Sequence, residues 1–402
     1  MHTKDTIAYF ARTNTRNKHM PFGIKYRDRL SHMHVIGKTG AGKTTLLETL
    51  ITQDIAHGCG VALIDPHGDF VDRIAASIPD HRVHDLVYIN VPDSTQPFGY
   101  NPLKHVVPEY RPLAASGILE VFKKMWKASW GQRLEHILRN AILALLESPH
   151  SQLGDILTLL TDKAFRKQTV QHLKNERVRD FWLKEYEHYS YRLRADAIVP
   201  IQNKVGAFLA DPILNRILTN PKQPINIRRI MDEGKILLVN LSKGRLGEDT
   251  AGLLGGLLVT TVGLAAFSRS DTPEEMRRPF YLFIDEFQNF TTLAIANMAS
   301  ELRKFQVGLV LAHQYLHQLD PDIRYAVLGN AGTLISFRLG GHDAPVIARE
   351  LLPAFGTEDL VNLPNYYIYL KLMIDGAPSK PFSAETVMLE EVNYFYRQLI
   401  GT

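Results

Sequence analysis

The 402-residue sequence has a single cysteine, Cys59. One thiol excludes an internal disulfide and any zinc or iron-sulfur site built from several cysteines, and it fits a reducing compartment. The sequence also lacks an excess of one charge, because 46 Lys and Arg residues are balanced by 42 Asp and Glu residues. With 45% hydrophobic and 22% charged residues, the composition excludes a disordered or fibrous chain.

Long hydrophobic runs are scarce, and the one that occurs covers residues 251–267. It is at the short end of the length that spans a bilayer, and four glycines interrupt it. A buried strand is expected just before it, so we predict a buried core helix packed closely on a sheet. The first residues lack the apolar segment of a secretory signal. We therefore expect no membrane span in this chain and a cytoplasmic protein.

Seven short apolar runs alternate with helical stretches, at residues 32–37, 60–65, 85–90, 235–241, 280–286, 307–313 and 332–337. These runs are nearly continuous rather than alternating, a pattern typical of strands buried on both faces of a parallel sheet. The sequence therefore predicts an α/β fold with a mainly parallel sheet flanked by helices. A further run at 366–375 is expected to add a strand at the edge of this sheet.

Residues 106–230 have no comparable strand pattern and are predicted to form an all-α insertion. We expect an N-terminal extension over 1–30, a first core part over 31–105, the insertion, and a second core part over 231–402. Residues 101–235 carry 22 Lys or Arg and 14 Asp or Glu. This local excess permits a polyanionic partner, but a solvated helical surface has the same pattern.

A phosphate-binding pattern, G-x-x-x-x-G-K-[ST], occupies Gly37, Lys38, Thr39, Gly40, Ala41, Gly42, Lys43 and Thr44. An apolar strand precedes it and an amphipathic helix follows it, which is the context that the motif requires. We predict that these residues and Thr45 bind ATP through backbone N–H groups at the helix N-terminus. Lys43 would contact the β and γ oxygens, and Thr44 would coordinate Mg²⁺.

A second motif lies at residues 281–286, where an apolar strand ends in Asp285 and Glu286. Asp285 is suited to hold Mg²⁺ through water, and Glu286 to orient and deprotonate the attacking water. A buried strand with this ending could instead cap a following helix. The phosphate loop in the same chain favours hydrolysis.

Two further residues could take part in the cleavage of the γ-phosphate. Gln314 follows the predicted strand 307–313, where a neutral amide could sense the γ-phosphate or the attacking water. Arg303 is expected near the end of a helix over about 293–305. It could reach a neighbouring subunit as an arginine finger, or it could be an exposed basic residue that favours a helix C-terminus. Arg338 is the competing finger candidate.

Two other groups have weaker signals. Asp65, His67 and Asp69 follow the second strand and form either a turn with a side-chain cap or a carboxylate-imidazole group near the nucleotide or a subunit contact. His313 and His317 are four residues apart but lack the glutamate of H-E-x-x-H, so no zinc site is expected. We also find no N-K-x-D or H-R-D pattern, which disfavours small GTPases and kinases.

The sequence resembles the HerA/FtsK group of P-loop motor ATPases with a RecA-like core, and within it the type IV secretion coupling proteins of the TraG/TraD type. The resemblance covers nearly the whole chain and is carried by six blocks: HVIGKTGAGKTT, GVALIDPHGDF, KILLVNLSKGR, FYLFIDEFQNF, ELRKFQVGLVLAHQ and GNAGTLISFRLGGHDA. It matches Lys43 and Thr44 to Walker A and Asp285 and Glu286 to Walker B.

The resemblance also implies roles and partners. Gln314 matches the sensor glutamine, and Arg303, eleven residues earlier, matches the arginine finger, which favours Arg303 over Arg338. The family implies a hexameric ring that moves DNA without reading its sequence, with a relaxase or secretion-channel components as partners. Coupling proteins usually begin with a transmembrane anchor, which has no counterpart in this sequence. This departure leaves open a soluble DNA motor or a protein held at the inner face of the cell membrane through such partners.

Contact with DNA has the least direct support in the sequence. Aromatic and basic residues that could stack on bases and neutralise phosphates occur in the insertion, namely Trp126, Trp130, Arg133, Trp182, Tyr189, Tyr191, Arg192 and Arg194. Core packing explains the tryptophans equally well. We expect an ATP-driven DNA translocase; a protein-secretion or assembly ATPase and a DNA-processing translocase of the HerA type are the alternatives.

Overall fold

A computed structural model describes residues 5–14, 19–127, 130–219 and 222–393. Its centre is an eleven-stranded sheet in the order β2-β1-β15-β12-β11-β3-β10-β9-β4-β8-β5. The strands from β11 to β5 in this order are parallel. They are β11 (Thr333–Ser336), β3 (Met33–Ile36), β10 (Val307–His313), β9 (Phe280–Ile284), β4 (Gly60–Asp65), β8 (Ile236–Asn240) and β5 (Leu86–Asn90). All seven predicted strands and the α/β fold are confirmed.

The other four strands extend the sheet in antiparallel fashion. They are β12 (Tyr367–Lys371), β15 (Phe382–Thr386), β1 (Ile7–Thr13) and β2 (Pro21–Lys25). The prediction that residues 366–375 form an edge strand was wrong, because β12 lies between β11 and β15. The segment expected as an N-terminal extension supplies β1 and β2, whose residues are only partly buried.

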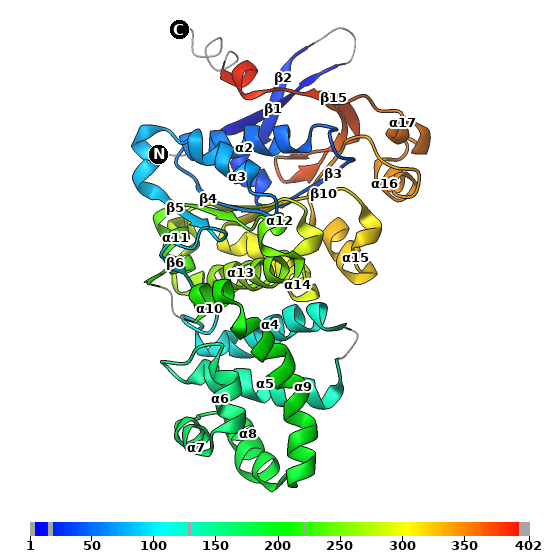
Figure 1. The fold of residues 1–402 in the computed structure, drawn as a ribbon. Coiled ribbons are helices and arrows are strands. Elements are labelled where there is room, and N and C mark those ends of the chain that lie inside the picture. The colour runs from blue at the N-terminus through cyan, green and yellow to red at the C-terminus, as the bar shows by residue number, and fades with distance from the viewer. Residues whose placement is uncertain (1–4, 15–18, 128–129, 220–221, 394–402) are drawn as a thin grey trace.

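Helices cover both faces of the sheet (Figure 1). One face packs against α2 (Lys43–Ala56) and α3 (Asp69–Ala76), and the other packs against α13 (Glu248–Ser268) and α14 (Leu293–Leu302). In β4, Val61 and Leu63 belong to the hydrophobic cluster that contains α2 and α3. Ala62 and Ile64 belong to the cluster that contains α13 and α14. Successive side chains of a strand point to opposite faces, so burial on both faces explains the continuous apolar runs.

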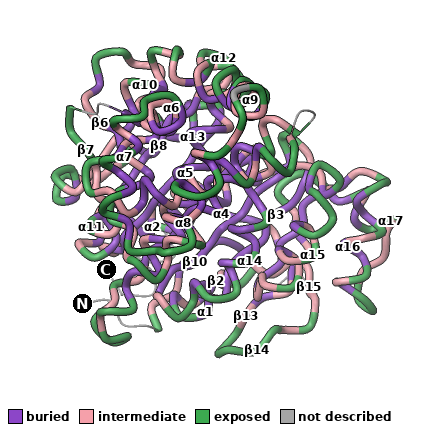
Figure 2. Tube along the Cα trace, turned by 90° about the horizontal axis from the view of Figure 1, so that it is seen from below, coloured by how far each residue is buried: buried purple, intermediate pink, exposed green. Residues whose placement is uncertain are grey.

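Helix α13 contains the long apolar run and lies within the core (Figure 2). It is long and apolar enough to cross a membrane, but 83% of its most apolar window is buried inside the protein. The predicted core helix is confirmed. The expectation that its glycines pack on the sheet is not met at Gly255 and Gly256, which instead allow close contact with a loop and with α4. A Cβ atom at Gly255 would lie 2.2 Å from Phe290, and one at Gly256 would lie 3.1 Å from Val121 of α4.

In the described part of residues 111–218, seven α-helices follow one another, below α13 in Figure 1. They are α4 (Arg111–Met125), α5 (Gln132–Glu147), α6 (Asp155–Thr161), α7 (Lys163–Gln171), α8 (Glu176–Asp180), α9 (Tyr191–Ala210) and α10 (Pro212–Leu218). The two-residue strand β7 (Gln223–Pro224) pairs with β6 (Phe98–Gly99) near the two junctions with the core. The region is helical as predicted, and the exact domain boundaries stay a prediction.

The remaining helices flank the sheet, and short strands and turns connect them. They are α1 (Tyr26–Arg29), α11 (Ile227–Glu233), α12 (Lys243–Leu246), α15 (Pro321–Asn330), α16 (Ala344–Leu351) and α17 (Thr357–Val361), with the hairpin β13 (Met373–Ile374) and β14 (Ala377–Pro378). The parallel strands all end at one edge of the sheet, which we call the carboxyl edge, and begin at the opposite amino edge. The predicted site residues can be placed relative to these two edges.

Candidate functional site

The phosphate-binding loop joins β3 to α2 at the carboxyl edge. Gly40 and Gly42 have φ angles of 74° and 120°, which L side chains rarely adopt. Gly37 is required for another reason, because a Cβ atom there would lie 2.5 Å from the Cβ atom of Phe337. These glycines let the loop close around the N-terminus of α2, where unpaired backbone N–H groups favour anions.

Lys43 is the first residue of α2, and its side chain is buried. Its ammonium donates hydrogen bonds to the carbonyl oxygens of Gly37 (2.6 Å) and Lys38 (3.1 Å). Burial lowers the pKa of Lys43, while the carboxylates of Glu286 and Asp285 act in the opposite direction. The ammonium thus lies between the phosphate loop and the two carboxylates.

Asp285 and Glu286 follow β9, two strands away from β3, and both are buried. Burial raises the pKa of Asp285 to about 6, with further contributions from the carboxylates of Glu286 and Asp65. The ammonium of Lys43 opposes this shift. The negative charge of these carboxylates is therefore only partly balanced by the ammonium of Lys43.

Oxygen donors of this kind suit Mg²⁺ bound together with nucleotide phosphates. The hydroxyl of Thr44 lies at the start of α2, and the carboxylate of Asp285 lies across the loop beside Lys43. The raised pKa of Asp285 indicates a site that a cation would stabilise. The residues present therefore fit the predicted ion.

Gln314 connects the two halves of the site. Its Oε1 accepts a hydrogen bond from the Thr39 hydroxyl (2.8 Å), and its Nε2 donates to Glu286 Oε1 (2.5 Å). The second oxygen of Glu286 accepts from Gln288 Nε2 (2.6 Å). Two amides thus orient Glu286, and one of them also contacts the phosphate loop.

The two arginine candidates lie at opposite edges of the sheet. Arg303 is exposed in the turn before β10, at the amino edge, and its guanidinium makes no hydrogen bond or ion pair with the described residues. Arg338 lies next to the phosphate loop, where its carbonyl accepts from Lys38 N (2.9 Å). The seven residues of β10 span about 23 Å, so Arg303 cannot reach the phosphate loop of its own chain.

Asp65 forms a turn and caps a helix. Its carboxylate accepts hydrogen bonds from backbone N–H groups of four residues, namely His67, Gly68, Phe70 and Val71. The side chains of His67 and Asp69 are exposed. The turn interpretation accounts for Asp65, and its charge reaches the site only through its effect on the pKa of Asp285.

His313 and His317 do not share a site. His313 is buried and stacks on His34, with their Nε2 atoms 2.6 Å apart, whereas His317 is exposed and lies 3.3 Å from Asp343. Burial lowers the pKa of His34 to about 4 and the pKa of His313 well below its usual range. His313 Nδ1 lies 3.2 Å from the Tyr315 carbonyl, so His313 donates there and accepts from His34.

The aromatic residues of the insertion differ in exposure. Trp182 is 1% exposed and packs against Phe181 and Tyr186, so the interpretation that it stacks on bases was wrong and core packing explains it. Trp126 and Trp130 are half-buried and stack on each other with ring centroids 6.4 Å apart.

The arginines and tyrosines proposed for DNA contact in the insertion also differ in exposure and in hydrogen bonding. Arg133 and Arg192 are exposed, whereas Arg194 donates to the carbonyls of Tyr186 and Glu187. The hydroxyl of Tyr189 donates to Glu185 (2.6 Å). The side chain of Tyr191 lies outside the described part of the chain. Arg133 and Arg192 are therefore the basic members of this set whose residues are exposed on the surface.

Three residues near the site were missed by the sequence analysis. Gln288 contacts Glu286, and its only signal is its position two residues after Glu286. Tyr366 donates its N–H to the Ala41 carbonyl (2.8 Å) and has a φ of 69°. Lys124, from α4, donates to carbonyl oxygens just after Gln288. Tyr366 and Lys124 are distant in sequence from the motifs that they contact, so no spacing could indicate them.

The fold is similar to that of solved motor proteins at low sequence identity. The unbound bacterial conjugative coupling protein TrwBdeltaN70 has 18% identity and a TM-score of 0.65, over 97% of this chain and 89% of that chain. TrwB in complex with ADP and Mg²⁺ has 18% identity and a TM-score of 0.62, over 92% and 87%. VirB4 of Thermoanaerobacter pseudethanolicus has 13% identity and a TM-score of 0.63, over 96% and 97%.

No curated protein sequence matches this chain. The model of one protein family, described as "Helicase HerA, central domain", matches residues 14–258, which is more than half of the chain and includes the phosphate-binding loop. This match confirms the resemblance to the HerA group. The chain therefore belongs to the HerA central-domain family.

Proposed function

We propose that this chain is a Mg²⁺-dependent ATPase that couples hydrolysis to the movement of DNA through a ring of identical subunits, as a coupling protein of conjugative or type IV secretion DNA transfer. The observation that carries the proposal is the position of Gln314, which hydrogen-bonds to both Thr39 and Glu286. A group that contacts the phosphate loop is thereby joined to the carboxylate suited to activate water. A protein that only binds nucleotide has no need for this connection.

Each residue of the site has a chemical task in this proposal. The backbone N–H groups of residues 37–45 and the ammonium of Lys43 would bind the phosphates of ATP. Thr44 and Asp285 would hold Mg²⁺, which when bound neutralises charge on the phosphate oxygens. Glu286 would accept a proton from the attacking water, and Gln314 would keep Glu286 oriented toward it.

Arg303 is the proposed finger of a neighbouring subunit. It is exposed, unpaired among the described residues and too far from its own phosphate loop, and these three facts support action in another copy of the chain. Arg338 lies on the same edge as the loop and would act, if at all, within its own subunit. A hexameric ring would give every site such a neighbour.

The DNA substrate is supported by family membership and by the fold shared with TrwB, which is described as a plasmid coupling protein and is known in complexes with ADPNP, GDPNP, and ADP with Mg²⁺. The exposed residues Arg133 and Arg192 lie in the basic insertion. We propose that basic groups of the ring contact the DNA backbone without reading sequence, so binding should weaken steeply with salt. A relaxase or channel component is the partner that this function requires.

The test is the steady-state rate of ATP hydrolysis with and without single-stranded and double-stranded DNA, with Glu286→Gln as the blank. Strong stimulation by either form of DNA supports the proposal, and the preferred form identifies the substrate. Hydrolysis that is robust and indifferent to DNA would overturn it in favour of a protein-secretion or assembly ATPase.

A further inference from the structure

The segment after Glu286 is held by a helix of the all-α region. The turn η8 (Phe287–Asn289) ends in carbonyl oxygens that its own backbone does not pair. Lys124 of α4 donates from its ammonium to the carbonyls of Gln288 (2.6 Å), Asn289 (3.0 Å) and Thr291 (3.1 Å). An ammonium has three N–H groups, so these three acceptors use all of them.

A second residue of α4 holds the next part of the same segment. The carboxylate of Glu120 accepts a hydrogen bond from Ala294 N (2.6 Å), at the first turn of α14. Thr292, at the N-cap position, makes no side-chain cap there, so Glu120 takes that place. Residues 120 and 124 are four apart and lie on one face of α4. That face therefore contacts both ends of residues 288–294.

This contact leads directly to Glu286. Lys124 binds the backbone carbonyl of Gln288, and the side chain of Gln288 donates to Glu286 Oε2. Glu286 itself has a φ of 48°, a left-handed conformation that costs energy for a residue other than glycine. Such a conformation persists only where the surroundings impose it, and the hydrogen bonds from α4 are part of those surroundings.

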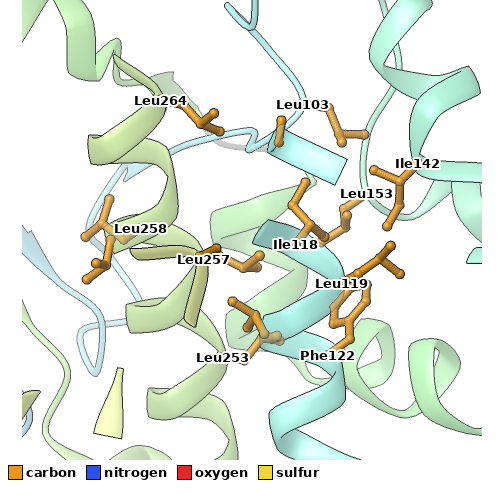
Figure 3. Packing of buried hydrophobic residues seen from close by; sticks show 14 of the residues in the cluster. Leu103, Ile118, Leu119, Phe122, Ile142, Leu153, Leu253, Leu257, Leu258 and Leu264 are labelled. Atoms are coloured by element: carbon orange, nitrogen blue, oxygen red, sulfur yellow. The ribbon is translucent and has the colours of Figure 1, made fainter. Parts of the chain in front are cut away.

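The apolar side chains of α4 pack against the core helix α13 and against other helices of the all-α region. Figure 3 shows Ile118, Leu119 and Phe122 of α4 between Leu253 and Leu257 of α13 and, on the other side, Ile142 and Leu153. Gly117 allows especially close packing on α13, because a Cβ atom there would lie 2.5 Å from Thr260 Cγ2. Helix α4 therefore contacts both the core helix α13 and helix α5 of the all-α region.

Among the residues that the structure describes, no carboxylate is hydrogen-bonded to the ammonium of Lys124. Desolvation lowers the pKa of Lys124 to about 8, and the carboxylate of Asp320 opposes this shift. Carbonyl oxygens are the groups that the ammonium contacts, so its place depends on the backbone of residues 288–291 being where it is.

We propose that Lys124 and Glu120 are positioning residues for hydrolysis, through which the all-α region sets the orientation of Glu286. The inference rests on the proposed ATPase function. It adds a route by which a polymer bound at the all-α region changes the rate of the chemical step: movement of α4 shifts residues 288–294, and Gln288 transmits the shift to Glu286. Neither residue touches the nucleotide in this account.

The test compares Lys124→Met, which keeps the stem and removes the three donors, with Lys124→Arg, which keeps donors and charge. Lys123→Met is the matched control, because Lys123 is adjacent on α4 and exposed and has only a 3.8 Å ion pair with Glu135. We expect Lys124→Met to lower kcat by about 10- to 100-fold with KM and ATP affinity within about 2-fold of the wild type. Lys124→Arg should recover most of kcat, and Lys123→Met should match the wild type.

A kcat for Lys124→Met within about 2-fold of the wild type would overturn the inference. A parallel fall in ATP affinity and melting temperature would also overturn it, because it would indicate a general structural role. Amide hydrogen exchange of residues 287–294 gives a second readout that does not depend on turnover: Lys124→Met should accelerate it and Lys123→Met should not. A wild-type protein that binds but does not hydrolyse ATP contradicts the proposed function, and unchanged exchange contradicts the positioning role separately.

Discussion

The candidate catalytic groups at the two edges of the parallel sheet differ in burial and in pairing. At the carboxyl edge, Lys43 and Glu286 are buried and Gln314 is half-buried, and each is hydrogen-bonded to a neighbour in the site. At the amino edge, Arg303 is exposed and has no partner among the described residues. In the proposed function, one chain supplies the phosphate loop and Glu286 of a site and presents, about 23 Å away, the cation that would complete the site of another chain.

The largest expected effect is at the carboxyl edge. Glu286→Gln removes the base but leaves the phosphate loop intact, so turnover should fall by about 10³-fold or more while ATP affinity stays near that of the wild type. Lys43→Ala should instead weaken ATP binding itself. Hydrolysis rates and equilibrium binding of a fluorescent ATP analogue separate the two effects. Equal loss of affinity in both variants would show that the roles are misassigned.

A similar loss of turnover is expected when the arginine at the amino edge is removed, because that residue would act on the site of a neighbouring subunit. Arg303→Ala should lower kcat by about 10³-fold without changing ATP affinity, because the residue would act only on the transition state of a neighbour. Arg338→Ala is the matched variant at the carboxyl edge and should retain most turnover. A loss in Arg338→Ala that exceeds the loss in Arg303→Ala would reverse the assignment.

Gln314→Ala should have a smaller effect, of about 10- to 100-fold on kcat, because Glu286 keeps its hydrogen bond from Gln288. The double variant with Gln288→Ala should lose more than the sum of the two single free-energy changes, since both amides orient the same carboxylate. Steady-state kinetics of the four proteins forms the cycle. Strict additivity would mean that the two amides act on Glu286 independently of each other.

Much of this arrangement could be predicted from the sequence. The continuous apolar runs of β3, β4, β8, β9 and β10 identified the parallel strands, and the glycine pattern of residues 37–44 identified the loop. Parallel strands end at one edge, so Asp285 and Gln314 were expected near Lys43, as they are. Burial on both faces and tight glycine turns leave direct traces in a sequence.

Other features leave no such trace. β1 and β2 join the sheet through β15, a pairing between chain positions more than 370 residues apart. Lys124 meets Gln288 across more than 160 positions, and its target is a backbone carbonyl, which any residue type supplies. The sequence left two interpretations of Trp182, because an aromatic side chain suits a hydrophobic core and a base-stacking surface equally. Its burial in the structure decides between them.

The smallest expected effect concerns the interior between the two edges, where His32, His34 and His313 are buried and neutral. Burial lowers the pKa of His32 and His34 to about 4, and that of His313 well below its usual range. Unfolded histidines bind protons at about pH 6.5, so the unfolded state binds more protons between pH 6.5 and 4 and stability falls as pH drops through that window.

We expect the melting temperature to fall by about 5 °C or more between pH 7 and 5, measured by scanning calorimetry. His34→Leu should reduce this pH dependence, because it removes one group that must stay unprotonated in the folded state. Its control is His67→Leu, since His67 is exposed. An equal pH dependence in the wild type and His34→Leu would contradict the assignment of neutral buried histidines.

The central claim is that the site is divided between two copies of the chain, and mixing two inactive variants tests it most directly. Arg303→Ala supplies an intact Glu286, and Glu286→Gln supplies an intact Arg303. After the subunits are mixed in equal amounts, roughly a quarter of the interfaces should combine both intact residues, and ATP hydrolysis should recover to at most about that fraction of the wild-type rate. A mixture no more active than its separate components would contradict the shared site.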